Sequence, residues 1–263
     1  MPYRIDISSP PSDALDVLID LGALDVEGVH DGLAALMPDA VTPDAVARAL
    51  GGAVVTVSAA VARDDASVWM LSPDTVRIGS LLIASPNAPP TLNALRLTDS
   101  GAFGTGHHPT TALCIEILEE MLSIERVESI LDVGTGSGIL ALAGLTMGVP
   151  RAIGLDIDPE GLKVAAQNAR MNHLDDRLQL VLGGPEDVNG MWPLVVANVL
   201  AAPLIDMAPI LVRRIRGRGR LILSGIPSSL ESEVRQAYQH FGMRQIGSET
   251  RAGWTTLVLQ ASW

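Results

Sequence analysis

The sequence predicts a doubly wound α/β domain with a mostly parallel sheet, preceded by a smaller α+β domain. Three observations favour this fold class. Short apolar runs alternate with helix-like segments from residue 99 onward, a glycine-rich loop at residues 134–138 follows one of these runs, and the first part of the chain lacks this rhythm. We therefore place residues 1–84 in the first domain, residues 85–98 in a linker and residues 99–263 in the second domain.

The first domain is predicted from short strands and two helices. Thr42 suits the N-cap of a helix that begins at Pro43, and the pair Gly51-Gly52 suits its end. The linker is placed after residue 84 because residues 85–90 contain three prolines. The expected strands cover residues 3–7, 23–29, 53–61 and 78–83, and the expected helices cover residues 13–21 and 43–50.

The second domain is predicted from five strands and five helices in a strand-then-helix rhythm, which is typical of parallel sheets with helices on both faces. Its last two strands, residues 243–247 and 254–259, form a hairpin-like pair. The other expected strands cover residues 129–133, 151–156, 178–182, 193–198 and 219–224, and the expected helices cover residues 110–122, 138–147, 159–171, 200–214 and 228–240.

Composition excludes several classes of function. The chain has 263 residues with 30 acidic and 18 basic side chains, a formal charge of −12, which disfavours binding to a nucleic-acid backbone. Its single cysteine, Cys114, excludes an internal disulfide and a cysteine-cluster zinc site, so we expect no metal. No apolar run reaches the ~18 residues of a membrane span. We expect a soluble, cytoplasmic protein without membrane contact.

The glycine-rich loop predicts a cofactor that contains adenosine. Gly134 and Gly136 allow the backbone a sharp turn and a close approach to a ligand. Asp156 ends the next predicted strand, where a carboxylate can accept both ribose hydroxyls. The alternatives are a purely structural turn and a nicotinamide-dependent dehydrogenase, but Ile139 stands where the dinucleotide motif requires a third glycine. Asp132, just before the loop, can face a cationic ligand through water or backbone.

Two further blocks contain candidate site residues. Residues 103–111 read Phe-Gly-Thr-Gly-His-His-Pro-Thr-Thr, a glycine-hinged loop that leads into a helix and can close over a ligand. The imidazole of His107 or His108 can relay a proton near neutrality, although a helix cap or loop positioning is the alternative. Asn198 ends another predicted strand and can accept a hydrogen bond from an amine, or simply cap the next helix.

These blocks carry a resemblance to a known family. The G-x-G-x-G spacing after Asp132 is similar to the S-adenosylmethionine motif of class I methyltransferases. Over residues 102–225 the chain resembles the bacterial lysine methyltransferases of large-subunit ribosomal protein eleven. The matching segments are AFGTGHHPTTALC at 102–114, LDVGTGSGILALA at 131–143, GLDIDP at 154–159, ANVLAAPL at 197–204 and LILSGI at 221–226.

The resemblance implies a seven-stranded class I methyltransferase sheet and S-adenosylmethionine as the cofactor. It implies that Thr111, Gly134, Asp156 and Asn198 contact that cofactor or line its pocket, with Phe103 in a loop over its methionine part. The first domain is then the module that binds the ribosomal protein. Scant aromatic residues and lysines in that domain depart from the family pattern.

The implied reaction is transfer of a methyl group to a lysine amine. Asn198 would orient the amine, and His107 is a candidate proton relay. Another protein lysine or a small amine is the alternative acceptor. Nucleobase amines are disfavoured because residues 198–201 do not read Asn-Pro-Pro-Tyr, and Val199 and Leu200 stand where the two prolines would be.

Overall fold

The computed structural model describes residues 2–29, 32–62, 69–70, 76–86, 93–98 and 108–263. The chain divides into two compact units, Met1–Pro73 and Asp74–Trp263, which are described separately here. Among the described residues, no helix has both the length and the apolar character needed to cross a membrane.

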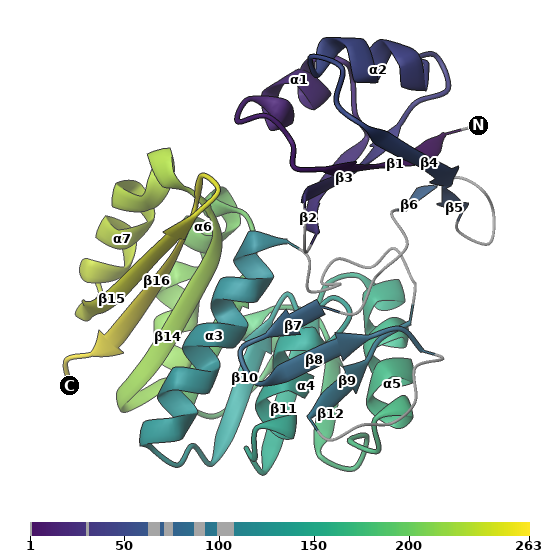
Figure 1. The fold of residues 1–263 in the computed structure, drawn as a ribbon. Coiled ribbons are helices and arrows are strands. Elements are labelled where there is room, and N and C mark those ends of the chain that lie inside the picture. Colours follow the sequence, from purple (N-terminus) through teal and green to yellow (C-terminus); the bar gives the residue numbers. More distant parts are fainter. Residues whose placement is uncertain (1, 30–31, 63–68, 71–75, 87–92, 99–107) are drawn as a thin grey trace. The chain divides into compact units, whose positions relative to one another are not determined.

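The first unit contains a four-stranded antiparallel sheet in the order β2-β3-β1-β4, with both helices on one face (Figure 1). Side chains such as Ile5, Met37 and Val46 are buried between the sheet and the helices. The predicted cap is present, because Thr42 accepts a hydrogen bond from the Ala45 amide. The elements are β1 (Tyr3–Ser8), α1 (Ala14–Asp20), β2 (Asp25–Val29), β3 (Gly32–Met37), α2 (Pro43–Ala49) and β4 (Val55–Ala59), followed by the short pair β5 (Val61–Ala62) and β6 (Trp69–Met70).

A second, three-stranded sheet belongs to the larger unit. It consists of β7 (Val76–Ile78), β8 (Leu81–Ala84) and β9 (Ala94–Arg96). Its buried side chains pack with those of α3 (Pro109–Ile124) and α4 (Ile139–Thr146) in one hydrophobic core. The structure therefore divides the chain before β7, whereas the sequence-based division placed β7 and β8 in the first domain and β9 in the linker. Linker residues 87–92 lie outside the described residues.

The main sheet has seven strands in the order β12-β11-β10-β13-β14-β16-β15. Its first five strands are parallel, and β16 and β15 are antiparallel additions. This confirms the predicted doubly wound sheet. The strands are β10 (Ser129–Val133), β11 (Arg151–Asp156), β12 (Leu178–Leu182), β13 (Trp192–Asn198), β14 (Ile215–Pro227), β15 (Met243–Arg251) and β16 (Trp254–Ala261).

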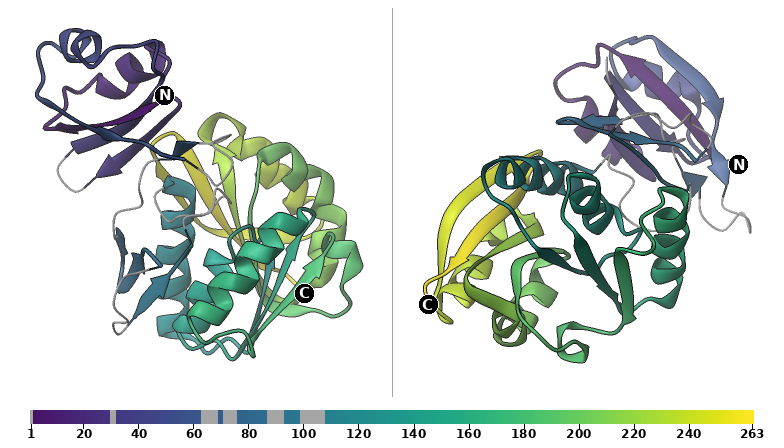
Figure 2. Two further views of the ribbon diagram at one scale, coloured as in Figure 1. Left: turned by 90° about the vertical axis from the view of Figure 1, so that its right-hand side faces the viewer. Right: turned by 90° about the horizontal axis from the view of Figure 1, so that it is seen from below.

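Helices cover both faces of this sheet (Figure 2). Alternate strand residues point to opposite cores: Ile130 packs with α3 and α4, and Leu131 packs on the other face. The remaining helices are α5 (Pro159–Met171), α6 (Ala201–Leu211) and α7 (Glu231–Gln239), with short 3₁₀ turns at Pro185–Asp187, Val212–Arg214 and Ser228–Leu230. The strand order reverses between β10 and β13, and ligands bind at such a switch point in open α/β sheets.

Candidate active site

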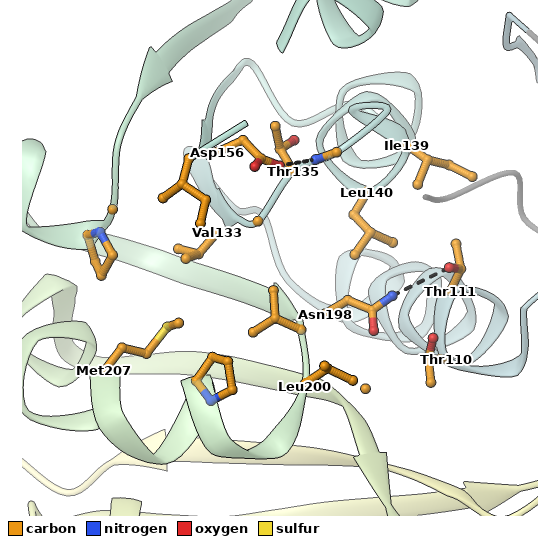
Figure 3. A pocket seen from close by; sticks show the side chains of 18 of the residues that line it. Thr110, Thr111, Val133, Thr135, Ile139, Leu140, Asp156, Asn198, Leu200 and Met207 are labelled. Carbon is orange, nitrogen blue, oxygen red and sulfur yellow. Dashed lines mark hydrogen bonds between the residues drawn. The ribbon is translucent and has the colours of Figure 1, made fainter. Parts of the chain in front are cut away.

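A cavity of about 600 Å³ lies at the carboxyl ends of the parallel strands (Figure 3). Five of the residues singled out in the sequence line it, namely Thr111, Gly134, Gly136, Asp156 and Asn198. They come from four separate segments, which the fold brings together because the carboxyl ends of parallel strands meet at one edge. The other two predicted site residues, Phe103 and His107, lie outside the described residues.

The glycine loop forms one wall of the cavity in a conformation that excludes side chains. Gly134 has a φ of +71°, and a Cβ atom at this position would lie 2.4 Å from Cγ1 of Val199. The amides of Gly134 and Thr135 donate to the carbonyl of Leu155 at 2.9 and 2.8 Å. The loop is therefore pinned to β11 and leaves bare backbone facing the cavity.

Asp156 joins the glycine loop to the end of β11. Its Oδ2 accepts a 2.7 Å hydrogen bond from the amide of Gly136, and its Oδ1 accepts a 2.9 Å bond from the amide of Asp158. Each carboxylate oxygen keeps a further lone pair for a ligand. Ile157, 82% exposed, follows at the cavity wall and adds an apolar surface beside the carboxylate.

Asn198 and Thr111 form the polar part of the opposite wall. The Asn198 amide Nδ2 donates to the Thr111 hydroxyl at 3.4 Å (Figure 3). Asn198 does not cap the next helix, because Leu200 occupies the N-cap of α6 and no side chain bonds there. The Asn198 Oδ1 is buried and has no hydrogen-bond partner among the described residues. A buried acceptor without a partner is destabilising, so this oxygen is poised for a donor on a ligand.

The comparison with known protein families decides the assignment. A model of the family described as "Ribosomal protein L11 methyltransferase (PrmA)" matches residues 44–262. The chain belongs to this family.

Individual proteins similar to this chain carry the same family name. The ribosomal protein L11 methyltransferase of Hamiltonella defensa is 42% identical over 65% of this chain, which spans 57% of that protein. The Myxococcus xanthus relative of the same name is 31% identical, with 97% of this chain and 96% of that protein aligned. A crystal structure of a ribosomal protein L11 methylase from Lactobacillus delbrueckii subsp. bulgaricus has a TM-score of 0.65 and 28% identity, covering 72% of this chain and 99% of that chain.

These findings confirm the predicted family, class I methyltransferase fold, enzyme class and S-adenosylmethionine dependence. Methylation of ribosomal protein L11, the function predicted from the sequence, is the activity in this family's name. The alternative of a nicotinamide-dependent dehydrogenase is set aside.

The methyltransferase cavity contains one aromatic residue that the sequence did not indicate, beside a histidine that it did. Trp254, at the start of β16, lines the cavity and meets the His108 ring edge to face at 5.1 Å. His108 is the N-cap of α3, and its Nδ1 lies 2.7 Å from the Thr110 hydroxyl. Trp254 carries no local sequence signal, since it reaches the site only through the pairing of β16 with β14.

Asp132 lies under the glycine loop and is not a lining residue. Its Oδ2 accepts bonds from the Thr135 hydroxyl at 2.7 Å and the Ala141 amide at 3.1 Å. Burial raises the pKa of Asp132 from 3.8 to about 6, against the opposing effect of these two hydrogen bonds. The carboxylate therefore holds the loop to α4 through Oδ2. That it faces a cationic ligand through water or backbone stays a prediction.

This burial predicts a pH dependence of stability. Because the folded pKa is raised, the folded protein binds more protons than the unfolded chain between about pH 4 and pH 6. The free energy of unfolding should therefore fall as pH rises through this window, by an amount of the order of 2–3 kcal/mol. Asp132→Asn removes the titration, so urea unfolding should show the variant gaining stability relative to the parent from pH 4 to pH 7. Asp175→Asn makes the same chemical change at an exposed position and is the control. A stability difference between Asp132→Asn and the parent that does not change with pH would contradict the assignment.

Two acidic residues after β12 remain outside the cavity. Gly183, Gly184 and Pro185 line the cavity, but Glu186 and Asp187 do not. The Asp187 carboxylate instead accepts a hydrogen bond from the Gly184 amide at 2.9 Å. The loop thus presents backbone to a ligand at this end of the site.

The arginine-rich stretch at residues 213–220 is largely engaged within the protein. Arg214 donates to the Pro185 carbonyl at 2.7 Å, Arg216 pairs with Glu128 at 3.2 Å, and Arg220 pairs with Glu125 at 3.1 Å. These contacts account for three of the five arginines in the stretch. Among the described residues, no group of three or more His, Cys, Asp or Glu side chains is placed to hold a metal ion.

Proposed function

We propose that this cavity transfers methyl groups from S-adenosylmethionine to lysine amines of ribosomal protein L11. The observation that carries the proposal is the buried Asn198 Oδ1, an acceptor without a partner, in a cavity that the glycine loop and Asp156 also line. The family membership supports the methyl donor and the protein acceptor.

The residues present fit the donor. Asp156 provides two carboxylate oxygens for the ribose hydroxyls, and Ile157 provides an apolar surface next to it. Gly134 leaves room where any side chain would collide with Val199. When bound, S-adenosylmethionine supplies a methyl group that its sulfonium already activates.

The acceptor amine has to reach the site uncharged. A free lysine amine has a pKa of about 10.4 and is mostly protonated near neutrality. The cavity walls include Leu140, Leu200 and Met207, whose apolar surfaces exclude water and so lower the pKa of an entering amine. Asp156 is the only carboxylate among the described lining residues and faces the ribose in this proposal. His108, which also lines the cavity, uses its Nδ1 to cap α3. In this proposal the proton therefore leaves to water before transfer. The Asn198 Oδ1 then accepts an amine N–H and aligns the nitrogen for in-line attack.

Incubation with methyl-labelled S-adenosylmethionine and purified ribosomal protein L11 tests this proposal. Label should appear on lysine residues of the ribosomal protein, located by mass spectrometry. Label on a different protein or a small amine in cell extract, with none on L11, would favour the alternative acceptor. A folded enzyme that binds the cofactor and labels no amine would contradict the proposal.

Replacement of Asn198 by alanine should lower kcat at least about tenfold, because the amine loses its orienting acceptor. The Kd for S-adenosylhomocysteine should change much less than kcat. The matched control is Asn189→Ala, at an exposed asparagine that does not line the cavity, and it should leave both values unchanged. An Asn198→Ala enzyme with the parent kcat would refute the orienting role.

We further infer that the first unit recognises the protein substrate and that the enzyme works in the cytoplasm, where ribosomal proteins are made. Residues 1–73 contain 11 acidic and 3 basic side chains, a formal charge of −8 out of −12 for the whole chain. That charge favours a basic protein partner and disfavours nucleic acid or an anionic membrane surface. The engaged arginines at residues 214, 216 and 220 support the same inference.

A further inference from the structure

A fully buried asparagine on α5 makes an unusual set of contacts. Asn168 is 0% exposed, and the same helix buries Ala165 and Ala169. A polar side chain at such a position destabilises the fold unless it is hydrogen bonded. The Asn168 Oδ1 accepts from the Thr98 amide at 2.8 Å and from the Thr98 hydroxyl at 3.1 Å, and its Nδ2 donates to the Ser137 carbonyl at 2.9 Å.

One of these contacts holds the glycine loop. Ser137 stands between Gly136 and Gly138, so its carbonyl belongs to the loop that lines the cavity. The preceding residue is held independently, because the Gly136 amide donates to Asp156 at 2.7 Å. Two consecutive loop residues are thus fixed by two different side chains, Asp156 at the end of β11 and Asn168 on α5.

The other contacts hold Thr98, the residue just before segment 99–107. We propose that Asn168 is a positioning residue for the methyl transfer. It ties Ser137 of the cofactor loop and Thr98 to the same side chain. The geometry of the donor site then depends on Asn168, although this residue does not line the cavity.

Asn172, the C-cap residue of α5, provides the comparison. Its Oδ1 accepts from the Arg96 amide at 2.9 Å, and its Nδ2 donates to the carbonyls of Arg96 and Asn168, both at 2.7 Å. This side chain therefore anchors Arg96, the last residue of β9, to the end of α5 with bonds of similar length. Among the described residues it has no hydrogen bond to the glycine loop, so its loss should lower stability and leave that loop in place.

The test compares Asn168→Asp, Asn168→Ala and Asn172→Ala in the full-length chain. In Asn168→Asp one side-chain oxygen can still accept from Thr98. The second oxygen replaces the amide group that donates to the Ser137 carbonyl, so two acceptors face each other. We expect both Asn168 variants to raise the Kd for S-adenosylhomocysteine, measured by calorimetry well below the Tm, about tenfold. Asn172→Ala should lower the Tm and leave this Kd within about twofold of the parent value.

Thr98→Val is the variant to test if the Asn168 variants fail to fold. It removes only the hydroxyl group that donates to Asn168 and preserves the shape of the side chain. It should raise the KM for S-adenosylmethionine and leave the KM for ribosomal protein L11 unchanged.

Only this kinetic comparison rests on the proposed function. A parent enzyme that binds S-adenosylhomocysteine but does not methylate L11 would refute the proposed function and leave the inference on Asn168 standing. The inference on Asn168 is overturned if the folded Asn168 variants bind S-adenosylhomocysteine like the parent, if Asn172→Ala weakens binding equally, or if Thr98→Val leaves both KM values unchanged.

Discussion

Replacement of Asp156 by alanine should raise the Kd of the methyltransferase for S-adenosylhomocysteine about 10- to 100-fold. The carboxylate offers charged acceptors for two ribose hydroxyls, and a hydrogen bond to a charged group contributes about 1.5–3 kcal/mol. The same side chain holds the amides of Gly136 and Asp158, so its loss also loosens the glycine loop. Isothermal titration calorimetry measures the change directly.

Two matched variants separate the ribose contact from a general disturbance of the loop. Asp156→Asn keeps one acceptor oxygen and should give an intermediate Kd. Asp158→Ala removes the N-cap of α5, where the carboxylate accepts from the Glu160 amide at 2.9 Å, and should cost about 0.5–2 kcal/mol of stability. Its Kd should equal that of the parent. An unchanged Kd for Asp156→Ala would show that this carboxylate does not bind the ribose.

Much of the larger unit could be predicted from the sequence because its signals are local. The parallel strands are buried on both faces and so appear as short apolar runs, and Asp158 and Pro159 mark the start of α5. Strand β3, Gly32–Met37, was not predicted. Its last four residues are all buried, and such a short continuous apolar run cannot be assigned to a strand or a helix by periodicity.

The structure divides the chain earlier than the sequence-based division, for a different physical reason. The proline-rich stretch at residues 85–90 indicated a linker, but the strands on either side of it, β8 and β9, pair in parallel with each other. Their side chains complete the core of α3 and α4, which begin 13 and 43 residues after the end of β9. The amino-acid composition of a short stretch indicates how stiff that stretch is. It does not indicate which residues elsewhere in the sequence the neighbouring strands pack against.

The candidate site shows the same contrast. Gly134, Asp156 and Asn198 each follow a predicted strand, and the fold rule for parallel sheets places them together. Gly225 follows the predicted strand 219–224 in the same way. Trp254 lines the same cavity but begins β16, which is antiparallel to β14. Its approach depends on that pairing, which no short sequence pattern specifies.

Gly225→Ala should be the most damaging single-methyl substitution in the cavity wall. Gly225 has a φ of +79°, and an added Cβ would lie 2.3 Å from the carbonyl oxygen and 2.8 Å from the carbonyl carbon of Val199. These are backbone atoms, so no side-chain rotation relieves the collision. Val199 follows Asn198 directly, and its displacement would carry the orienting amide with it. We expect a loss of more than about 3 kcal/mol of stability together with a loss of activity.

Gly253→Ala isolates the cause of this effect. Gly253 has a φ of +78°, nearly that of Gly225, but no atom lies within 4 Å of the position of its added Cβ. This variant should therefore lose only the free energy needed to hold an alanine in the left-handed backbone region, about 1–2 kcal/mol of stability. Urea unfolding of both variants should show a clear excess loss for Gly225→Ala, and kcat measured where each remains folded should fall only for that variant. Equal losses would mean that backbone strain alone, without collision against Val199, explains why a glycine occupies position 225.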